Sequence, residues 1–376
     1  MQDNRFARLI AALIVAAAPL AAPAQEPGSV EREVRARMDA LRAIQPGGDQ
    51  ARLEANNRKM DETWKYFDAN RARALPVLRT ELAAEITRPD HNNLVLLGGG
   101  FYLYTHGDKT DRDPARNALF AIDPAAPIVR WNMEQYFFFV HAVSIDRDPR
   151  ILGLIDRAFL DRKVELVIPE LALNLDESSV CMFLYGAYGD GAEAHLQPFL
   201  KDPKRVRKTL EILIWIGTPA SNAVVFDTLK ANRDIEVFGR ATAFLMQNGG
   251  PEGRQLMLSV DPATLEPKSA EFYSKGRPHI EAVSEQWYKG LFDRFQGTAK
   301  LSDADVRQKL AAMKAGRGRD ESLSPKAIYT SGIPRDELIG ELMAARAAML
   351  RQLYDQSLDD VRMTNMMING LRFRAQ

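Results

Sequence analysis

The chain has 376 residues, of which 46% are hydrophobic, and its 50 basic residues balance 50 acidic ones. Balanced charge gives no overall field toward nucleic acid or an anionic membrane surface, so neither is an expected partner. The single cysteine, Cys181, cannot form an intrachain disulfide, and its apolar neighbours predict a buried, inert thiol. The fold must therefore be held together by an apolar core.

The first 24 residues have the pattern of a secretory signal peptide. A weakly basic start with Arg5 and Arg8 precedes an apolar run over 9–18, and Ala22-Pro23-Ala24 supplies small residues at a cleavage site. The run is too short to span a bilayer, and no later stretch is long and apolar enough to do so. We expect cleavage after Ala24 and a periplasmic or secreted protein. An uncleaved anchor or a disordered leader is the alternative.

Residues 25–90 are predicted to form N-terminal helices. Amphipathic patterns over 30–44 and 52–67 lie on either side of a Pro46-Gly47-Gly48 turn, and 74–87 is a third such segment.

A repeated phrase begins after residue 100. Residues 101–114 read FYLYTHGDKTDRDP, and residues 136–149 read YFFFVHAVSIDRDP. The step is 35 residues without a gap, so His106 returns as His141 and Asp111 as Asp146. A period near 35 residues is the length of one helix–turn–helix unit, which predicts a repeat array.

The pattern continues to residue 262 with less identity. Each copy has an apolar helix end, then a turn with Gly or Asp, then a second amphipathic helix, as over 194–200, 222–230 and 252–260. Gly is suited to the left-handed conformation that ends a helix, and Pro219 and Pro251 stand where the next helix begins. We therefore assign 91–262 to the array.

The stretch 189–260 resembles the HEAT-repeat family. The residues that carry the resemblance are Gly189-Asp190, Leu196, Leu200, Asp202-Pro203, Arg207, Leu210, Ile216-Gly217, Leu229, Asp234, Val237, Ala241, Leu245 and Gly249. The resemblance implies an α-solenoid and says almost nothing about a ligand. Upstream the chain departs from the family pattern, with extra sequence over 161–176 and Gly98-Gly99-Gly100 inside an expected helix. These glycines indicate either close helix packing or a helix break.

The repeat signal fades after residue 262. Residues 263–322 are interpreted as a helical extension and linker, with a helix over 281–295 and a capping box of Ser302 and Asp305 before a helix to Lys314. Residues 323–376 are predicted to form a helical hairpin, opened by Pro334 and ended by Asn369-Gly370. This hairpin either caps the array or pairs with another subunit. The predicted fold class is all-α: an α-solenoid of HEAT-like helix pairs with additional N- and C-terminal helices.

Polar groups in the repeated turns are the candidate binding residues. They are His106, Asp108, Asp111, His141 and Asp146, together with Tyr136 from a run of four aromatics that cover most of a helix circumference. Such a row on a rigid array could contact a partner. The alternative interpretation is that histidines and aspartates only cap helices and that the aromatics are core.

No catalytic, cofactor or metal site is predicted, because the chain has no nucleophile elbow, no His-Glu-x-x-His and no Cys/His cluster. The first functional hypothesis is an exported, non-enzymatic repeat scaffold that binds a protein or peptide partner. The second is a periplasmic enzyme, or a ligand- or metal-binding protein, with a pocket in the turn row near His106 and His141.

Overall fold

The computed structural model describes residues 28–171, 173–295, 301–354 and 356–374. The predicted signal peptide, residues 1–24, lies outside these described residues. The chain divides into two compact units, an N-terminal unit of residues 28–158 and 166–170 and a C-terminal unit of residues 159–165 and 171–374. The division falls inside the range 91–262 predicted for the array.

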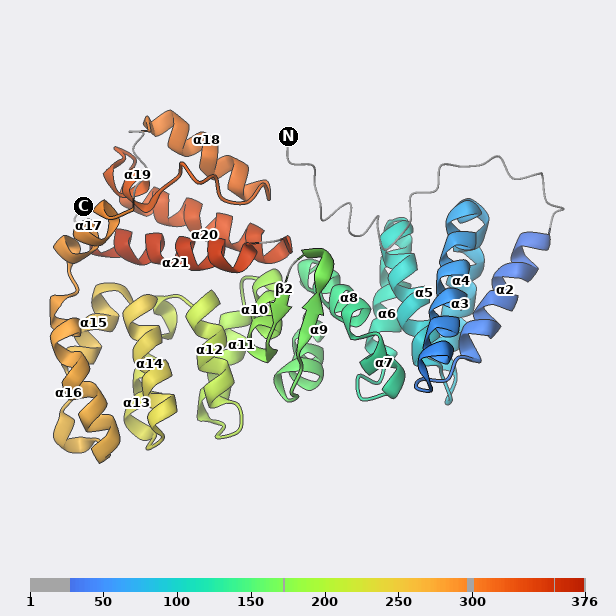
Figure 1. Cartoon of the computed structure of the whole chain (residues 1–376), viewed down its shortest axis with the longest axis horizontal. Helices are drawn as coiled ribbons and strands as arrows, with labels where there is room; N and C mark the ends of the chain where they lie inside the picture. The colour runs from blue at the N-terminus through green and yellow to red at the C-terminus, as the bar shows by residue number, and fades with distance from the viewer. Residues whose placement is uncertain (1–27, 172, 296–300, 355, 375–376) are drawn as a thin grey trace. The chain divides into compact units, whose positions relative to one another are not determined.

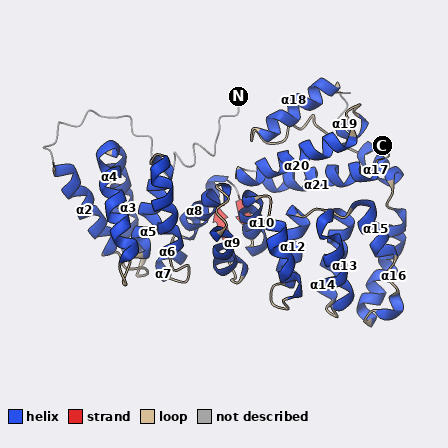
Figure 2. Cartoon of the chain, turned by 180° about the vertical axis from the view of Figure 1, so that it is seen from behind, coloured by secondary structure: helices blue, strands red, loops and turns tan. Residues whose placement is uncertain are grey.

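Both units are helical, which confirms the all-α prediction (Figure 2). In the described residues the strands are β1 (Leu166–Ile168) and β2 (Leu173–Leu175). Both lie in the segment 161–176 where the repeat pattern breaks down, and three residues are too few to give an alternating signal. No helix among the described residues combines the length and the apolar character that crossing a membrane requires.

The N-terminal unit is built around one fully buried helix. Its helices are α2 (Ser29–Arg42), α3 (Gln50–Ala69), α4 (Arg71–Thr87), α5 (Asn93–His106), α6 (Arg112–Ala121), α7 (Pro127–Trp131), α8 (Met133–Ile145) and α9 (Arg150–Ile155). Helix α5 packs against α4, α6 and α8, and all its residues from Leu94 to Tyr104 are buried. The three amphipathic segments predicted over 30–87 are confirmed as α2, α3 and α4.

Three consecutive glycines allow this burial. Gly98, Gly99 and Gly100 lie inside the continuous helix α5, so they mark close packing and not a helix break. A Cβ on Gly98 would lie 2.4 Å from the ring of Trp64, and one on Gly100 would lie 3.0 Å from Ala118. Glycine lowers the intrinsic stability of a helix, but at these positions its lack of a side chain lets the neighbouring side chains approach closely.

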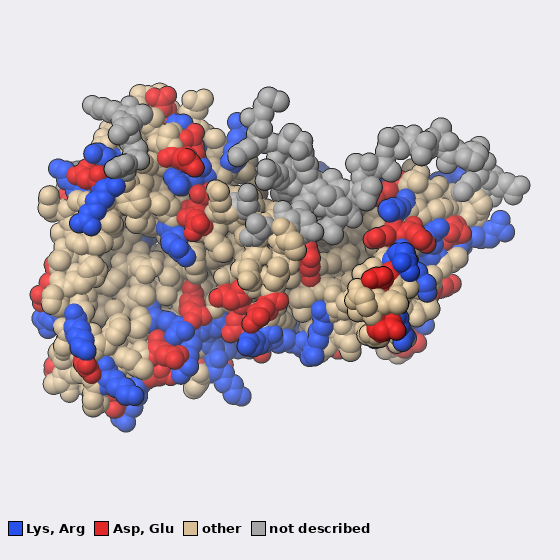
Figure 3. All heavy atoms as spheres, in the orientation of Figure 1, with Lys and Arg blue, Asp and Glu red and all other residues tan. Residues whose placement is uncertain are grey.

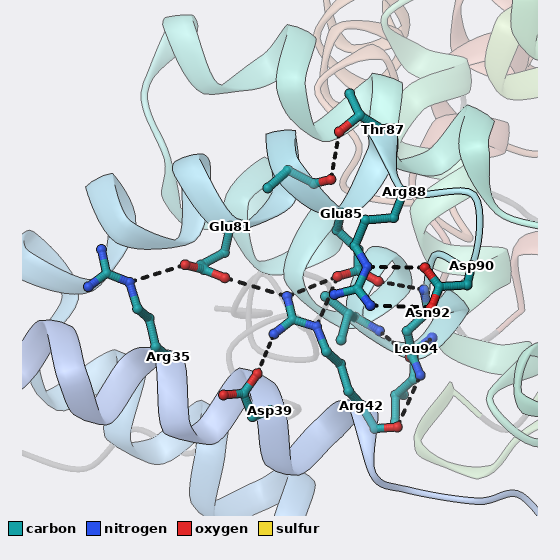
Figure 4. A network of polar contacts seen from close by, with 12 residues as sticks. Arg35, Asp39, Arg42, Glu81, Glu85, Thr87, Arg88, Asp90, Asn92 and Leu94 are labelled. Carbon is teal, nitrogen blue, oxygen red and sulfur yellow. Dashed lines mark hydrogen bonds and ion pairs between the residues drawn. The ribbon is translucent and has the colours of Figure 1, made fainter.

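An ionic network joins the ends of α2 and α4 to the start of α5 (Figure 4). The carboxylate of Glu85, which is 1% exposed, accepts a hydrogen bond from Arg42 at 2.9 Å and one from the backbone N–H of Asn92 at 2.6 Å. Arg42 also pairs with Asp39 at 2.6 Å and with Glu81 at 3.4 Å. The buried carboxylate is thus fully paired, and it fixes three helices relative to one another.

The C-terminal unit contains two rows of helices and a hairpin. Its helices are α10 (Glu177–Tyr188), α11 (Ala192–Leu196), α12 (Val206–Ile216), α13 (Asn222–Ala231), α14 (Ile235–Gln247), α15 (Gly250–Leu258), α16 (Pro267–Ala282), α17 (Glu285–Asp293), α18 (Asp303–Lys314), α19 (Pro325–Thr330), α20 (Arg335–Arg351) and α21 (Ser357–Phe373). Helices α10, α12, α14 and α16 contact one another in chain order. The short helix η4 (Gln197–Lys201), α13 and α15 form the second row.

The hairpin of α20 and α21 lies across the ends of α12 and α14 (Figure 1). A helix leaves its last carbonyls without partners, and two asparagines of α21 supply donors to them. Asn365 donates from Nδ2 to the carbonyl of Trp215 at 2.8 Å, and Asn369 donates to the carbonyl of Met246 at 2.9 Å. The predicted helix end at Asn369-Gly370 is therefore wrong: α21 continues to Phe373, and Asn369 is a buried contact.

Two arginines of the hairpin complete the same contact. Arg346 donates to the carbonyls of Ile216 at 2.9 Å and Gly217 at 3.4 Å, and Arg372 donates to the carbonyl of Asn248. Burial lowers the pKa of each guanidinium to about 10, so both remain charged at neutral pH. A cation beside helix C-termini is stabilised by the helix dipole. The predicted capping box of Ser302 and Asp305 is confirmed at the start of α18.

The glycine packing gives a first prediction. We expect Gly98→Ala to destabilise the protein by about 1–3 kcal/mol, because the added methyl overpacks against Trp64. The matched change Gly276→Ala in α16 meets nothing within 4 Å and should stabilise by about 0.5–1 kcal/mol through helix propensity. Urea unfolding followed by circular dichroism measures both. Equal effects of the two changes would show that α5 is not closely packed.

The hairpin contact gives a second prediction. We expect Asn369→Leu to cost about 1–3 kcal/mol, because Met246 O, Gly250 N and Tyr288 Oη lose their partner in a buried site. The exposed change Asn57→Leu in α3 serves as the control and should stay within about 0.5 kcal/mol of the parent. Urea unfolding again gives the free energies. A neutral Asn369→Leu would contradict the role assigned to this side chain.

Candidate functional site

The repeated turns do not have the same local structure. His106 is the last residue of α5, whereas His141 lies four residues before the end of α8. Asp111 is the N-cap of α6, whereas Asp146 is the C-cap of α8. His106 and His141 are therefore equivalent in the 35-residue repeat of the sequence but not in the fold. Helix α5 ends at His106, whereas α8 continues for four residues beyond His141.

Three of the six candidate side chains in this row are buried. Tyr136 is 0% exposed, and Asp111 and His141 are each 1% exposed. Asp111 accepts a hydrogen bond from Arg79 of α4 at 2.5 Å, and it also accepts the backbone N–H of Asp108. A buried side chain cannot contact a partner in this fold, so the structure gives these three a packing role.

The other three are partly accessible but already have local contacts. His106 is half-buried against Tyr102, with ring centroids 4.5 Å apart, and burial lowers the pKa of its imidazole. Asp108 accepts hydrogen bonds from Thr110 in the next turn, and Asp146 accepts one from the hydroxyl of Tyr104 at 2.8 Å.

These residues do not converge on a chemical site. A cavity of about 200 Å³ beside them is lined by Phe101, Tyr104, Thr105, Arg112, Phe138, Ala142 and Ile145, so neither histidine lines it. In the described part of the chain no group of three His, Cys, Asp or Glu side chains is placed to hold a metal ion. Nothing in this geometry favours an enzyme in the turn row.

A larger cavity, of about 440 Å³, lies in the C-terminal unit. We call it the α21 pocket. It is lined by Ile214, Trp215, Met246, Gln247, His279, Val283, Trp287, Tyr288, Leu291, Arg362, Asn365, Met366 and Asn369. The residues from α12, α14 and α16 are at the C-terminal ends of those helices, and α21 lies across them. The pocket is therefore a product of the hairpin contact.

Aromatic rings form much of its wall. Trp287 meets Tyr288 edge-on at 4.9 Å and His279 at 5.6 Å between ring centroids. The guanidinium of Arg362 lies over the ring of Trp215 at 5.5 Å. Aromatic side chains lose little conformational entropy on binding, which suits them to the wall of a binding pocket.

The deep polar groups of the pocket are already used by the fold. Asn365 donates to Trp215 O and accepts from Arg346 at 2.8 Å, while Asn369 hydrogen-bonds the hydroxyl of Tyr288 at 2.6 Å. Burial raises the pKa of Tyr288 to about 12, so its phenol stays protonated. These hydrogen bonds hold the walls of the pocket in place, and the interior that remains is apolar.

The rim of the pocket carries unused donors. Among the described contacts, no hydrogen bond engages the indole N–H of Trp215 or Trp287 or the side-chain amide of Gln247. The rim also contains His279 and the exposed Arg362, whereas no Asp or Glu lines the cavity. Figure 3 shows charges of both signs over the visible face, with an uncharged area on the C-terminal unit between them.

An accessible strip of α16 leads to the pocket. Phe272, Gly276 and His279 lie on one face by helical spacing, and Phe272 is 46% exposed although its ring contacts Phe238 at 6.0 Å. A methyl group added at Gly276 would have nothing within 4 Å, so the middle of the strip is open. We call these three residues the α16 strip.

Sequence reasoning missed this site. The wall comes from segments far apart in the sequence: Trp215 and Asn365, for example, are 150 residues apart. The one local feature of the sequence that could have indicated the site is a group of large side chains over 279–292. This stretch has no counterpart in the predicted repeats. No motif predicts which distant helix covers them.

Comparison of the chain with protein-family models, with curated proteins and with solved structures finds no match. The candidate site therefore rests on its geometry: an apolar, aromatic-walled pocket whose rim offers hydrogen-bond donors and whose lining has no carboxylate.

Proposed function

We propose that the chain is an exported, non-enzymatic scaffold of the HEAT-like α-solenoid type that binds a protein or peptide partner through the α21 pocket. The contacts of α10, α12, α14 and α16 in chain order support the solenoid interpretation. Arg207 of α12 pairs with Asp234 before α14, and both residues belong to the set that resembles the HEAT pattern. The ion pair connects successive helices of that row.

One observation carries the binding proposal: the α21 pocket is apolar, aromatic and open, and its deep polar groups, Asn365 and Asn369, are used for structure. An active site would need a positioned nucleophile, base or metal. The lining contains no Ser, Thr, Cys, Asp or Glu, so its one imidazole, His279, has no such nucleophile or carboxylate beside it in the lining. Cys181 is fully buried in α10, as expected from its neighbours. A pocket of this composition is suited to holding apolar groups.

Export is the basis of the third prediction. We expect the mature protein to be periplasmic or secreted and to begin at Gln25, because the small residues before it match a signal-peptidase site. Cell fractionation followed by intact-mass measurement tests this. A protein that keeps Met1, or one found only in the cytoplasm, would exclude the signal-peptide assignment.

The fourth prediction concerns the location of partner binding. We expect a photo-crosslinking amino acid in place of Gln247, at the pocket rim, to give a discrete adduct with a partner in the native cell. The same amino acid in place of Lys230 in α13, which is exposed and outside the pocket, is the control. Trp215→Ala with Trp287→Ala should abolish the adduct, because the aromatic wall is lost.

Two results would contradict the proposal. An adduct formed from position Asp108 and not from Gln247 would place the partner at the turn row of the N-terminal unit. Steady turnover of a small molecule by the purified protein would replace the scaffold hypothesis with an enzymatic one.

A further inference from the structure

We propose that the α21 pocket and the α16 strip bind the C-terminal segment of a partner protein, with a bulky apolar last side chain in the pocket and the terminal carboxylate at Arg362. This inference rests on the proposed function and adds the chemistry of the occupant. It combines a pocket walled on one side by α21, a rim rich in hydrogen-bond donors and an open approach along α16.

The charge of the lining selects an acceptor-rich occupant. Arg and the indole of Trp donate hydrogen bonds and accept none, and Arg362, Trp215 and Trp287 all line the cavity. No Asp or Glu lines the cavity to receive a cationic or donor-rich group, and Asp359, outside the lining, is already paired with Arg362. A carboxylate satisfies these donors with charge-assisted hydrogen bonds, which are stronger than neutral ones.

Arg362 is available for this role. Its ion pair with Asp359 is 3.7 Å long, and the two side chains are 72% and 80% exposed. An exposed pair of this kind contributes little to stability, so an incoming carboxylate can compete for the guanidinium. The contact of Arg362 with Trp215 keeps the cation beside the pocket.

The α21 wall of the pocket favours a chain terminus over a continuous segment. Helix α21 lies across the ends of α12 and α14 (Figure 1) and is bonded to them through Asn365 and Asn369, which both line the pocket, so α21 forms its wall on that side. A peptide that approaches along α16 therefore meets α21 at the pocket. Its last residue then meets the rim donors, which is the arrangement in which a terminal carboxylate is captured.

The α16 strip, which leads to the pocket, is as long as a short peptide. Phe272 and His279 are seven residues apart on α16, which corresponds to about 10 Å along a helix. An extended chain covers that distance with about three residues. Gly276 in the middle leaves room for a backbone, and the exposed ring of Phe272 offers an apolar contact at the far end.

The test uses N-terminally labelled hexapeptides and the full mature protein. One peptide, Gly-Ser-Gly-Val-Ala-Phe, has a free terminal carboxylate, the second is its C-terminal amide, and the third ends in Ser. Fluorescence anisotropy should show that amidation weakens binding at least tenfold, and that the Ser-ended peptide binds at least tenfold more weakly than the first. Equal binding of the acid and the amide would overturn the inference.

Variants locate the effect on the protein. Arg362→Gln should reduce the affinity for the free acid to that for the amide and leave the amide unaffected. Arg233→Gln, which removes another exposed arginine of the same unit with a side chain 88% exposed, should change neither. Gly276→Trp adds bulk where nothing lies within 4 Å, so the fold should persist while both peptides lose at least tenfold in affinity. Unchanged binding in Arg362→Gln or Gly276→Trp would contradict the assignment.

Two further outcomes separate this inference from the proposed function. Dodecanoate that displaces the acid peptide at equal or lower concentration would make the pocket a site for small amphipathic anions and overturn the peptide terminus. Failure of all three peptides to bind, together with a discrete adduct from position Gln247 in cells, would reject the carboxylate inference while the scaffold proposal holds.

Discussion

The capping of helix C-termini by the hairpin of α20 and α21 is the interaction on which the C-terminal unit depends. The helices of one row all end on the same side, and each end presents carbonyls that need donors. Asn365, Asn369, Arg346 and Arg372 supply those donors from residues far along the chain. A single element thereby covers the C-terminal ends of α12 and α14. The α21 pocket is the space that this cover leaves between α12, α14, α16 and α17.

The same contact decides which polar groups of the α21 pocket already have partners within the fold. Asparagine can serve as a versatile ligand contact, but Asn365 and Asn369 each use both ends of the amide within the fold. The groups that stay unused are donors at the rim and apolar side chains inside. The polar groups of the pocket therefore differ with depth: hydrogen bonds at the bottom hold the walls, and the charged group of Arg362 lies at the rim.

Local patterns predicted the elements better than their contacts. The capping box at Ser302 depends on residues three apart, and the amphipathic helices over 30–87 depend on a period within one segment, so both were accessible from sequence. Asn369-Gly370 has the composition of a helix end, yet a Cβ on Gly370 would meet the ring of Phe292 at 2.4 Å. Because of this tertiary packing, Asn369 and Gly370 lie within α21 and do not end it.

The candidate site shows the same limit. The 35-residue echo is real in the sequence, but burial of Asp111, Tyr136 and His141 depends on neighbours such as Arg79 that no period reveals. The turn glycines also differ: Gly189 has φ of 80° as expected at a helix end, whereas Gly217 has φ of −72°. At Gly217 the reason for glycine is close approach, because a Cβ would lie 2.6 Å from Phe244.

The long sequence separation of the hairpin contacts has a consequence for biogenesis. Asn365 lies 150 residues from the carbonyl it caps, and Asn369 lies 123 residues from its own. A chain made from its N-terminus therefore completes α12 and α14 well before their covering element exists. Contacts between residues so far apart in the sequence form late in folding. Until they form, the uncovered helix ends can associate with the wrong partners. Folding of this unit is thus tied to complete synthesis, and the pocket arises only in its last step.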